Sequence, residues 1–360
     1  MLVMNRVIYL IVFLLCFVQS VLGYLVPLFQ IDQLVESSDF IGVCKVQQID
    51  MDLPQSDKTA CFKAECEVVS TLKGQTEKSV TVLTFLYPNV RPDNLGFGSL
   101  KKGDVAILFL KNSKQNSFDF ANKYHPKIPL FKFYEQQDVA TNNVKKRINS
   151  QLMQALESDN PKEITNAIFW LTEIDEDIPQ DKLLEFAKSE NKDLRVASLR
   201  RLIRYKNKTA ILDASLWLLT PNIDIKLSES QLAELAWTLE LEAGNVDLDL
   251  ANRLAASSNE IIQRVGVYIL REVGNRSSIP ILIQALDAEN IDTQVSAVGV
   301  LSKITGKKGA SRDEFMKNPS SETQKWKAWW QEESKKKRES ELSSGSKSTV
   351  TNSIKSNVSK

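Results

Sequence analysis

Five ten-residue segments decide the fold of the second half of this chain: KEITNAIFWL (162–171), DLRVASLRRL (193–202), SQLAELAWTL (230–239), IIQRVGVYIL (261–270) and DTQVSAVGVL (292–301). When the segments are stacked, the tenth residue is always Leu and the sixth is always small or apolar: Ala167, Ser198, Leu235, Gly266 and Ala297. Positions four apart share one helix face, and small residues let neighbouring helices approach closely. The nearly constant interval between segments predicts serially stacked helices, two per repeat, over residues 150–306.

One of these segments carries a family resemblance. DLRVASLRRL combines an acidic turn residue with Val, Arg, Ala and Leu in the order that is typical of HEAT repeats. The chain is similar to the short bacterial type of these repeats over roughly residues 160–306, although Gln263 and Gln294 stand where the family often has Arg. The resemblance implies an α-solenoid, in which each two-helix unit contacts only its neighbours along the chain.

The segment after the repeats contains three tryptophans at helical spacing. Trp326, Trp329 and Trp330 follow a Thr-Gly turn, and their spacing puts the indoles on one side of a helix. Secreted bacterial HEAT-repeat proteins have a similar ending. We expect residues 307–333 to form a helix that covers the open apolar face of the last repeat. Residues 334–360 hold seven Lys or Arg against two Glu and almost no apolar residues, which predicts a disordered basic Ser/Lys tail.

Residues 24–140 have the composition of a small β domain. After a short helical stretch at 30–37, alternating or continuous apolar runs predict five strands: DFIGVCKVQQI (39–49), CFKAECEVVSTL (61–72), SVTVLTFLY (79–87), VAILFL (105–110) and PLFKFY (129–134). Five strands in a segment of this size favour a small β-barrel or sandwich. The expected fold class is therefore α+β multidomain, with a small β-barrel or sandwich followed by a HEAT-like α-solenoid.

The β region loosely resembles an N-terminal domain of secreted bacterial proteins that is similar to netrin-like or OB-type barrels. The residues that carry this resemblance are SDFIGVCKV (38–46), the turn Leu72-Lys73-Gly74, and Lys102-Gly103-Asp104 before the fourth expected strand. Netrin-like protease inhibitors depend on a Cys at the mature N-terminus. The first residue expected here is Tyr24, so the resemblance does not extend to that inhibitory mechanism.

The segment 1–23 has the layout of a secretory signal peptide. MLVMNR is a short basic start, VIYLIVFLLCFV is a continuous apolar run, and QSVLG ends in the small Gly23. The apolar run is shorter than the roughly 20 residues that span a bilayer. We expect cleavage after Gly23 and an extracytoplasmic location, either periplasmic or secreted. The alternative is an uncleaved membrane anchor, because the segment 24–29 prolongs the apolar run.

Three cysteines remain when the signal peptide is removed. Cys61 and Cys66 are five positions apart in one expected strand, which separates them by about 16 Å at roughly 3.3 Å per residue. A disulfide needs Cα atoms within about 7 Å. Because export favours oxidation, Cys44 is the expected partner of whichever of the other two forms a disulfide. The alternative is that all three are small buried hydrophobic residues.

Catalytic and metal-binding motifs are absent from the sequence. There is one histidine, His125, which rules out a zinc site with two or more His ligands. No nucleophile elbow, Walker loop, dinucleotide-binding glycine motif or HExxH motif occurs. These absences predict a protein that is not an enzyme and uses no cofactor or metal. The net charge of +1 provides no global field that would attract nucleic acid.

One repeat is unusually rich in cations. Arg195, Arg200, Arg201 and Arg204 are grouped in the second of the five segments and just after it. An arginine stripe on a solenoid surface can bind carboxylate or phosphate groups of a partner. The alternative is a solvated helix face whose long side chains cover apolar neighbours.

These observations predict a non-catalytic extracytoplasmic binding or scaffold protein. Its expected partners are other proteins or envelope polymers and not nucleic acid, and it would contact a membrane only if the N-terminal segment were retained. This expectation rests partly on analogy, because a fold does not by itself determine a function. The alternatives are an envelope-associated enzyme, or an accessory subunit of one, and a membrane-tethered adaptor.

Overall fold

The computed structural model describes residues 31–52, 61–75, 77–85, 100–113, 117–121, 127–134, 143–220 and 227–355, with backbone only for 51–52, 61–62, 84–85 and 340–355. The chain has an α+β two-part architecture with a small β-barrel at the N-terminal end and a helical region after it. It divides into two compact units, Met1–Pro179 and Gln180–Lys360.

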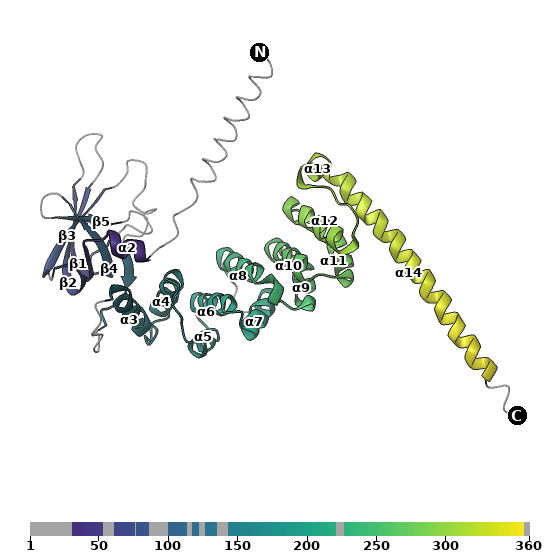
Figure 1. Cartoon of the computed structure of the whole chain (residues 1–360), viewed down its shortest axis with the longest axis horizontal. Coiled ribbons are helices and arrows are strands. Elements are labelled where there is room, and N and C mark those ends of the chain that lie inside the picture. The colour runs from purple at the N-terminus through teal and green to yellow at the C-terminus, as the bar shows by residue number, and fades with distance from the viewer. Residues whose placement is uncertain are drawn as a thin grey trace, which may run out of the picture. The chain divides into compact units, whose positions relative to one another are not determined.

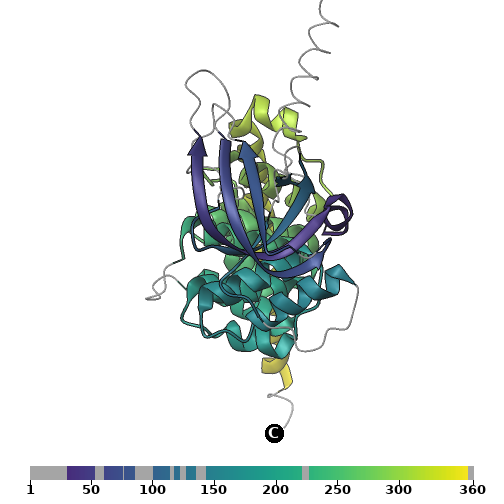
Figure 2. The same cartoon turned by 90° about the vertical axis from the view of Figure 1, so that its left-hand side faces the viewer.

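In its described residues, the first unit contains a closed barrel and three helices (Figures 1 and 2). Its elements are α2 (Ile31–Ser37), β1 (Phe40–Asp52), β2 (Cys61–Lys73), β3 (Ser79–Phe85), β4 (Val105–Asn112), β5 (Phe118–Phe120), β6 (Lys127–Leu130), α3 (Val144–Ala155) and α4 (Pro161–Glu173). The strand order is β1-β2-β3-β5-β4-β6, and an additional pairing of β1 with β4 closes the first five of these strands into a barrel. The pairing of β3 with β5 is parallel, whereas every other pairing between these strands is antiparallel. Closure leaves no free edge between β1 and β4.

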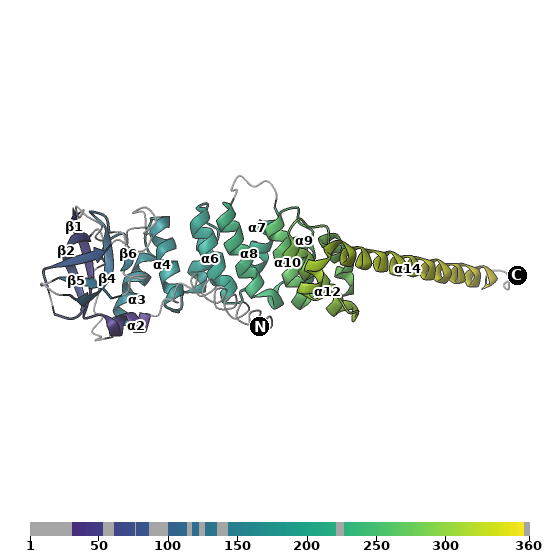
Figure 3. The ribbon, with the colours of Figure 1, turned by 90° about the horizontal axis from the view of Figure 1, so that it is seen from above.

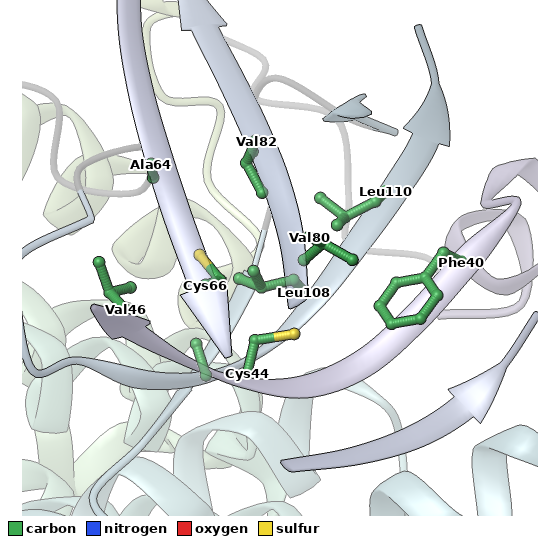
Figure 4. Packing of buried hydrophobic residues seen from close by; sticks show 10 residues of the cluster. Phe40, Cys44, Val46, Ala64, Cys66, Val80, Val82, Leu108 and Leu110 are labelled. Carbon is green, nitrogen blue, oxygen red and sulfur yellow. The ribbon is translucent and has the colours of Figure 1, made fainter. Parts of the chain in front are cut away.

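Apolar side chains from alternate positions along the strands fill the barrel (Figure 4). The inward residues include Phe40 and Cys44 of β1, Cys66 of β2 and Leu108 of β4, and all of them are buried. The intervening charged residues of β2, such as Lys63 and Glu65, face solvent as the alternation predicts.

Strand β4 is buried on both faces, because helices cover part of the outside of the barrel. Helix α2 contacts β4 and α3 contacts β2. Lys73, at the end of β2, donates hydrogen bonds of 2.6 Å to the carbonyl oxygens of Val35 and Ser38 at the C-terminal end of α2. The next residue, Gly74, has a φ of 93°, a conformation that favours glycine, so the turn predicted there is present.

Two strand predictions need correction. The segment predicted as a strand at 129–134 is paired only at its start, since β6 spans Lys127–Leu130. The three-residue strand β5 was not predicted, because Phe-Asp-Phe is too short for a period to be recognised. β5 pairs with both β3 and β4 and is therefore required for closure.

The first unit includes two helices that follow the barrel. The last described strand ends at Leu130, within the β domain expected over residues 24–140, and the helices α3 and α4 belong to the same unit as the barrel. Arg147 of α3 donates to the carbonyl oxygen of Leu72 at 3.2 Å, and Asn166 of α4 donates to that of Pro129 at 2.6 Å. These hydrogen bonds from side chain to backbone attach both helices to the barrel. The apolar periodicity of α3 and α4 does not predict this attachment.

The second unit consists of helices in two layers. Its elements are α5 (Gln180–Phe186), α6 (Lys192–Arg204), α7 (Lys208–Leu219), α8 (Glu229–Leu241), α9 (Leu248–Ala255), α10 (Glu260–Val273), α11 (Ile279–Ala285), α12 (Ile291–Thr305), α13 (Arg312–Lys317) and α14 (Pro319–Lys355), with short 3₁₀ turns at Ala243–Asn245 and Arg276–Ser278. Helices α6, α8, α10 and α12 contact one another in succession and form the even layer (Figure 3). Helices α7, α9 and α11 form the odd layer in the same way.

Each helix that contains one of the five repeated segments begins at an equivalent position. We call the sixth residue of each segment its register residue. An Asn or Ser lies seven positions before each register residue and accepts a hydrogen bond from the first turn of the helix; these residues are Asn160, Asn191, Ser228, Asn259 and Asn290. Such side chains satisfy amide groups that the helix itself leaves unpaired. The predicted periodicity therefore corresponds to a repeated helix start.

The C-terminal segment differs from its predicted state. Sequence analysis expected a helix that ends near 333 and a disordered tail over 334–360, but α14 continues to Lys355. Low apolar content argues against a packed core, yet it does not prevent a helix over residues 334–341, which are mostly Lys, Arg and Glu and have high helix propensity. The pairs Lys336–Glu332 at 2.7 Å and Lys335–Glu339 at 4.0 Å have the i,i+4 spacing that supports an exposed helix.

Candidate functional site

The four arginines that sequence analysis selected do not form one exposed stripe. The guanidinium carbon of Arg195 lies 4.1 Å from the ring centre of Trp217, and that of Arg201 lies 4.6 Å from the ring centre of Tyr205. Arg201 is only 5% exposed. These two side chains stack on aromatic rings within the unit, an arrangement that stabilises a cation locally.

The other two arginines differ from each other. Arg200 forms a salt bridge of 2.5 Å with Glu234 of α8, so it joins two adjacent helices of the even layer. A hydrogen bond from Gln231 of α8 to Asp193 of α6 joins the same pair of helices at 2.5 Å. Arg204 is the only one of the four that is exposed. The four arginines are therefore only partly exposed, and Arg200 is the member whose salt bridge joins two helices of the even layer.

The structure reveals a more exposed apolar surface on the even layer. The residue two positions after each register residue faces solvent or is half-buried; in α6, α8, α10 and α12 these residues are Arg200, Trp237, Tyr268 and Gly299, which we call the exposed row. Trp237 is 65% exposed and Leu241, one helical turn further along α8, is 64% exposed. Residues four apart lie on one face of a helix, so the two side chains form one apolar patch.

A cavity of about 310 Å³ lies beside the exposed row, between α10 and α12. Val267, Tyr268 and Arg271 of α10 line it together with Gly299, Val300 and Lys303 of α12. A Cβ atom at Gly299 would meet nothing within 4 Å, so this position has open space above it. The volume lies at the lower end of the range of small-molecule or side-chain binding pockets, roughly 300–1,000 Å³.

Sequence analysis missed Trp237, Leu241, Arg271 and Lys303. A signal for Trp237 is present in the sequence. The residue two positions after a buried register residue lies on a different face of the helix, so a large apolar side chain at that position is exposed. Trp237 stands at this position in the sequence, but it was read only as part of the apolar periodicity of SQLAELAWTL. Arg271 and Lys303 belong to different repeats, and only the packing of α10 against α12 brings them to one cavity.

The cysteines expected to form a disulfide are free thiols where the structure describes their side chains. Cys44 and Cys66 are both buried inside the barrel, and neither forms a disulfide. In the register of β1 and β2, Cys44 lies opposite Val68 and Cys66 opposite Val46. The two cysteines are thus diagonal neighbours, and diagonal positions are about 7–8 Å apart. That separation exceeds the Cα distance of most disulfides, which is about 4.4–6.8 Å.

Burial also disfavours the thiolate form of these cysteines. It raises the pKa of Cys66 to about 11, and burial together with the neighbouring Cys66 raises the pKa of Cys44 further. Because the thiolate is the reactive form, neither side chain resembles an activated nucleophile. The side chain of Cys61, the third candidate, lies outside the described residues.

The three tryptophans after the repeats differ in burial. Trp326 is 2% exposed and its indole N–H donates to Glu322 at 3.0 Å. Its ring contacts that of Trp329 edge-on at 5.5 Å, and Trp330 lies 6.2 Å from Trp329. Helix α14 contacts α11, and Lys327 of α14 forms a salt bridge with Asp287, just after α11. These contacts place the first indole in the core of the unit.

Several sequence-based expectations fall on residues outside the described ranges. They include the signal peptide at 1–23 and His125. In the described part of the chain, no group of three or more His, Cys, Asp or Glu residues could hold a metal ion. Among the helices that the structure describes, none combines the length and apolar character needed to cross a membrane.

Comparison with known proteins provides no family assignment. A scan against protein-family models finds no match, and a search of curated proteins finds no relative. Functional inference for this chain therefore depends on the surface just described.

Proposed function

We propose that this protein is a non-catalytic extracytoplasmic binding or scaffold protein that engages partner proteins through the even layer of its second unit. The observation that carries the proposal is the exposure of Trp237 and Leu241, at 65% and 64%, on adjacent turns of α8. Exposed clusters of large apolar side chains are typical of interaction sites, and Trp is enriched among residues that dominate binding energy.

The repeated helix start supports a finer architectural proposal. We infer a HEAT-like α-solenoid for the repeats, because capping residues recur at one register and helices of each layer contact their successors. Solenoids present long surfaces to partners. The closed barrel with its parallel β3–β5 pair likewise supports the resemblance to OB-type and netrin-like barrels.

The proposed location rests on the segment 1–23. A basic start, an apolar run and a small residue before Tyr24 favour export and cleavage. N-terminal sequencing of the protein recovered from the envelope or culture medium of its source cells should give Tyr24 as the first residue. Recovery with Met1 intact in the membrane fraction would instead support the tethered adaptor.

The binding proposal predicts a large effect of the patch on α8. Full-length protein carrying Trp237→Ser and Leu241→Ser should retain at least tenfold less of its co-purifying proteins than the wild type when captured from the envelope fraction. Truncation of a central aromatic anchor typically costs about 2 kcal/mol or more of binding free energy. Quantitative mass spectrometry of the captured proteins provides the measurement.

The odd layer offers a matched control. Leu212 and Leu216 of α7 are also one turn apart and exposed, at 45% and 37%. The double variant Leu212→Ser and Leu216→Ser removes two exposed apolar side chains from the other layer and should leave capture unchanged. Equal losses in both double variants, or no loss in the α8 variant, would contradict the proposal.

A further inference from the structure

The cavity between α10 and α12 has the lining expected of a site for a negatively charged group. Its charged lining residues are Arg271 and Lys303, and no carboxylate lines it. Neither cation forms a salt bridge with any residue that the structure describes. The ammonium of Lys303 donates a hydrogen bond to the backbone carbonyl of Arg271, which holds the two cationic residues beside each other.

Two acidic residues of the adjacent helix α8 interact with arginines outside the cavity. Glu234 of α8 is paired with Arg200 at 2.5 Å. Burial raises the pKa of Glu240, also on α8, and the charge of Arg264 on α10 partly offsets that rise. Because no carboxylate lines the cavity and neither of its cations forms a described salt bridge, its positive charge is available to an external anion. Arginine suits this role because its planar guanidinium can bind a carboxylate through two hydrogen bonds.

The cavity and the apolar patch belong to one continuous surface. Along the exposed row, Tyr268 of α10 lies between Trp237 of α8 and Gly299 of α12, since these helices are consecutive in the even layer (Figure 3). Helices that pack together have axes about 8–10 Å apart. The patch on α8 and the cavity between α10 and α12 are thus separated by about 10–15 Å, a distance that three to four residues of extended peptide span.

We propose that this surface binds an extended acidic segment of a partner protein. An Asp or Glu side chain of the segment enters the cavity and pairs with Arg271 and Lys303. An aromatic or branched apolar residue three or four positions away packs on Trp237 and Leu241. This inference rests on the proposed function and adds the chemistry that the partner must present.

A polyanionic envelope polymer fits this surface less well than a peptide. Sugar-phosphate chains carry charge at every repeat and are held by rows of cations. Here two cations line one cavity, and the neighbouring surface includes the apolar side chains of Trp237 and Leu241 and the ring of Tyr268. Such a combination of a single anion site and an apolar surface matches the alternation of side chains in a peptide.

The test is an unbiased selection of peptides on the full-length protein. A phage-displayed library of random dodecapeptides should yield an enriched motif with Asp or Glu three or four positions from an aromatic or branched apolar residue. A fluorescein-labelled synthetic copy of the most enriched peptide, and its version with Gln or Asn in place of the acid, then serve as probes for anisotropy titration.

Two substitutions examine the cavity by different means. Arg271→Gln removes one positive charge, and Gly299→Leu fills the open space without a clash at Cβ. Each should weaken binding of the acidic peptide at least tenfold and should have little effect on the neutral version. Arg253→Gln, on α9 of the odd layer, is the matched control and should leave the affinity unchanged.

Several outcomes would overturn the inference. They are a selection with no enriched motif, a motif without an acidic residue, or an acidic peptide that binds Arg271→Gln as tightly as wild type. Displacement of the peptide by equimolar dextran sulfate would favour the polymer. If Trp237→Ser weakens capture of partners while Arg271→Gln and Gly299→Leu do not, the proposed function survives and this inference fails. If Trp237→Ser also has no effect, the proposed function fails as well.

Discussion

Replacing Gly266 with alanine should lower the free energy of unfolding of the second unit by about 3 kcal/mol, the upper end of the usual cost of overpacking. Gly266 is the register residue of α10. A Cβ atom built there would lie 2.1 Å from the backbone nitrogen of Ala255 and 2.4 Å from the carbonyl carbon of Leu254, both in α9. The obstructing atoms are backbone, so no rotamer change can relieve the clash and the two helices must separate.

The opposite result is expected for the same substitution at Gly299. This glycine lies in α12, and its Cβ position has no heavy atom within 4 Å. Alanine is more favourable than glycine in a helix by about 0.8–1.0 kcal/mol, so Gly299→Ala should be neutral or stabilising. Thermal unfolding followed by circular dichroism, with hydrogen exchange of the α9 and α10 amides, measures both variants. Similar stabilities for the two variants would show that α9 and α10 do not approach closely.

The close contact at Gly266 illustrates what periodicity can predict. The sequence shows small residues at four of the five register positions, a pattern that indicates close approach of neighbouring helices, and at Gly266 the structure confirms it. It could not rank the positions, because the tightness of each contact depends on the partner helix. Leu235 occupies the same position in α8 and is fully buried, so the α8 repeat accommodates a large residue where α10 cannot.

Predictions failed where long-range contacts override local pattern. The β5 strand exists because β3 and β4 provide partners for Phe118–Phe120, and a three-residue segment contains no evidence of those partners. Similarly, the sequence of α6 suggests an exposed stripe of arginines, but Trp217 of α7 contacts Arg195 and Glu234 of α8 pairs with Arg200. A periodic pattern identifies a helix face and does not identify which residues the next helix will contact.

The second large effect is expected in the first unit, where a buried carboxylate joins α4 to the end of the barrel domain. Glu163 is 4% exposed, and it accepts hydrogen bonds from the hydroxyl groups of Tyr134 at 2.6 Å and Ser158 at 2.5 Å. Gln151 of α3 exchanges two further hydrogen bonds with the backbone of Tyr134. Together these bonds connect the chain after β6 with α3 and α4.

Tyr134→Phe should lower the free energy of unfolding of this unit by about 2 kcal/mol, because the substitution removes one donor from a buried charged acceptor and hydrogen bonds to charged groups contribute about 1.5–3 kcal/mol. Tyr268→Phe is the matched control, because no hydrogen bond is described for its hydroxyl group, and the substitution should change stability by less than about 0.5 kcal/mol. Hydrogen exchange measures the effect. The amides of α3 and α4 should exchange faster in the Tyr134→Phe variant than in wild type, and the Tyr268→Phe variant should show no such change.

The same residue should give this unit an alkaline pH dependence. Burial, and then the hydrogen bond to Glu163, raise the pKa of Tyr134 above its ordinary value. Above about pH 10 the unfolded chain therefore releases the tyrosine proton while the folded chain retains it, so folding stability falls as the pH rises. Phenylalanine has no such proton, and the difference in thermal stability between wild type and Tyr134→Phe should shrink between about pH 9 and pH 11. A constant difference across that range would mean that the Tyr134 hydroxyl is not held by the buried carboxylate.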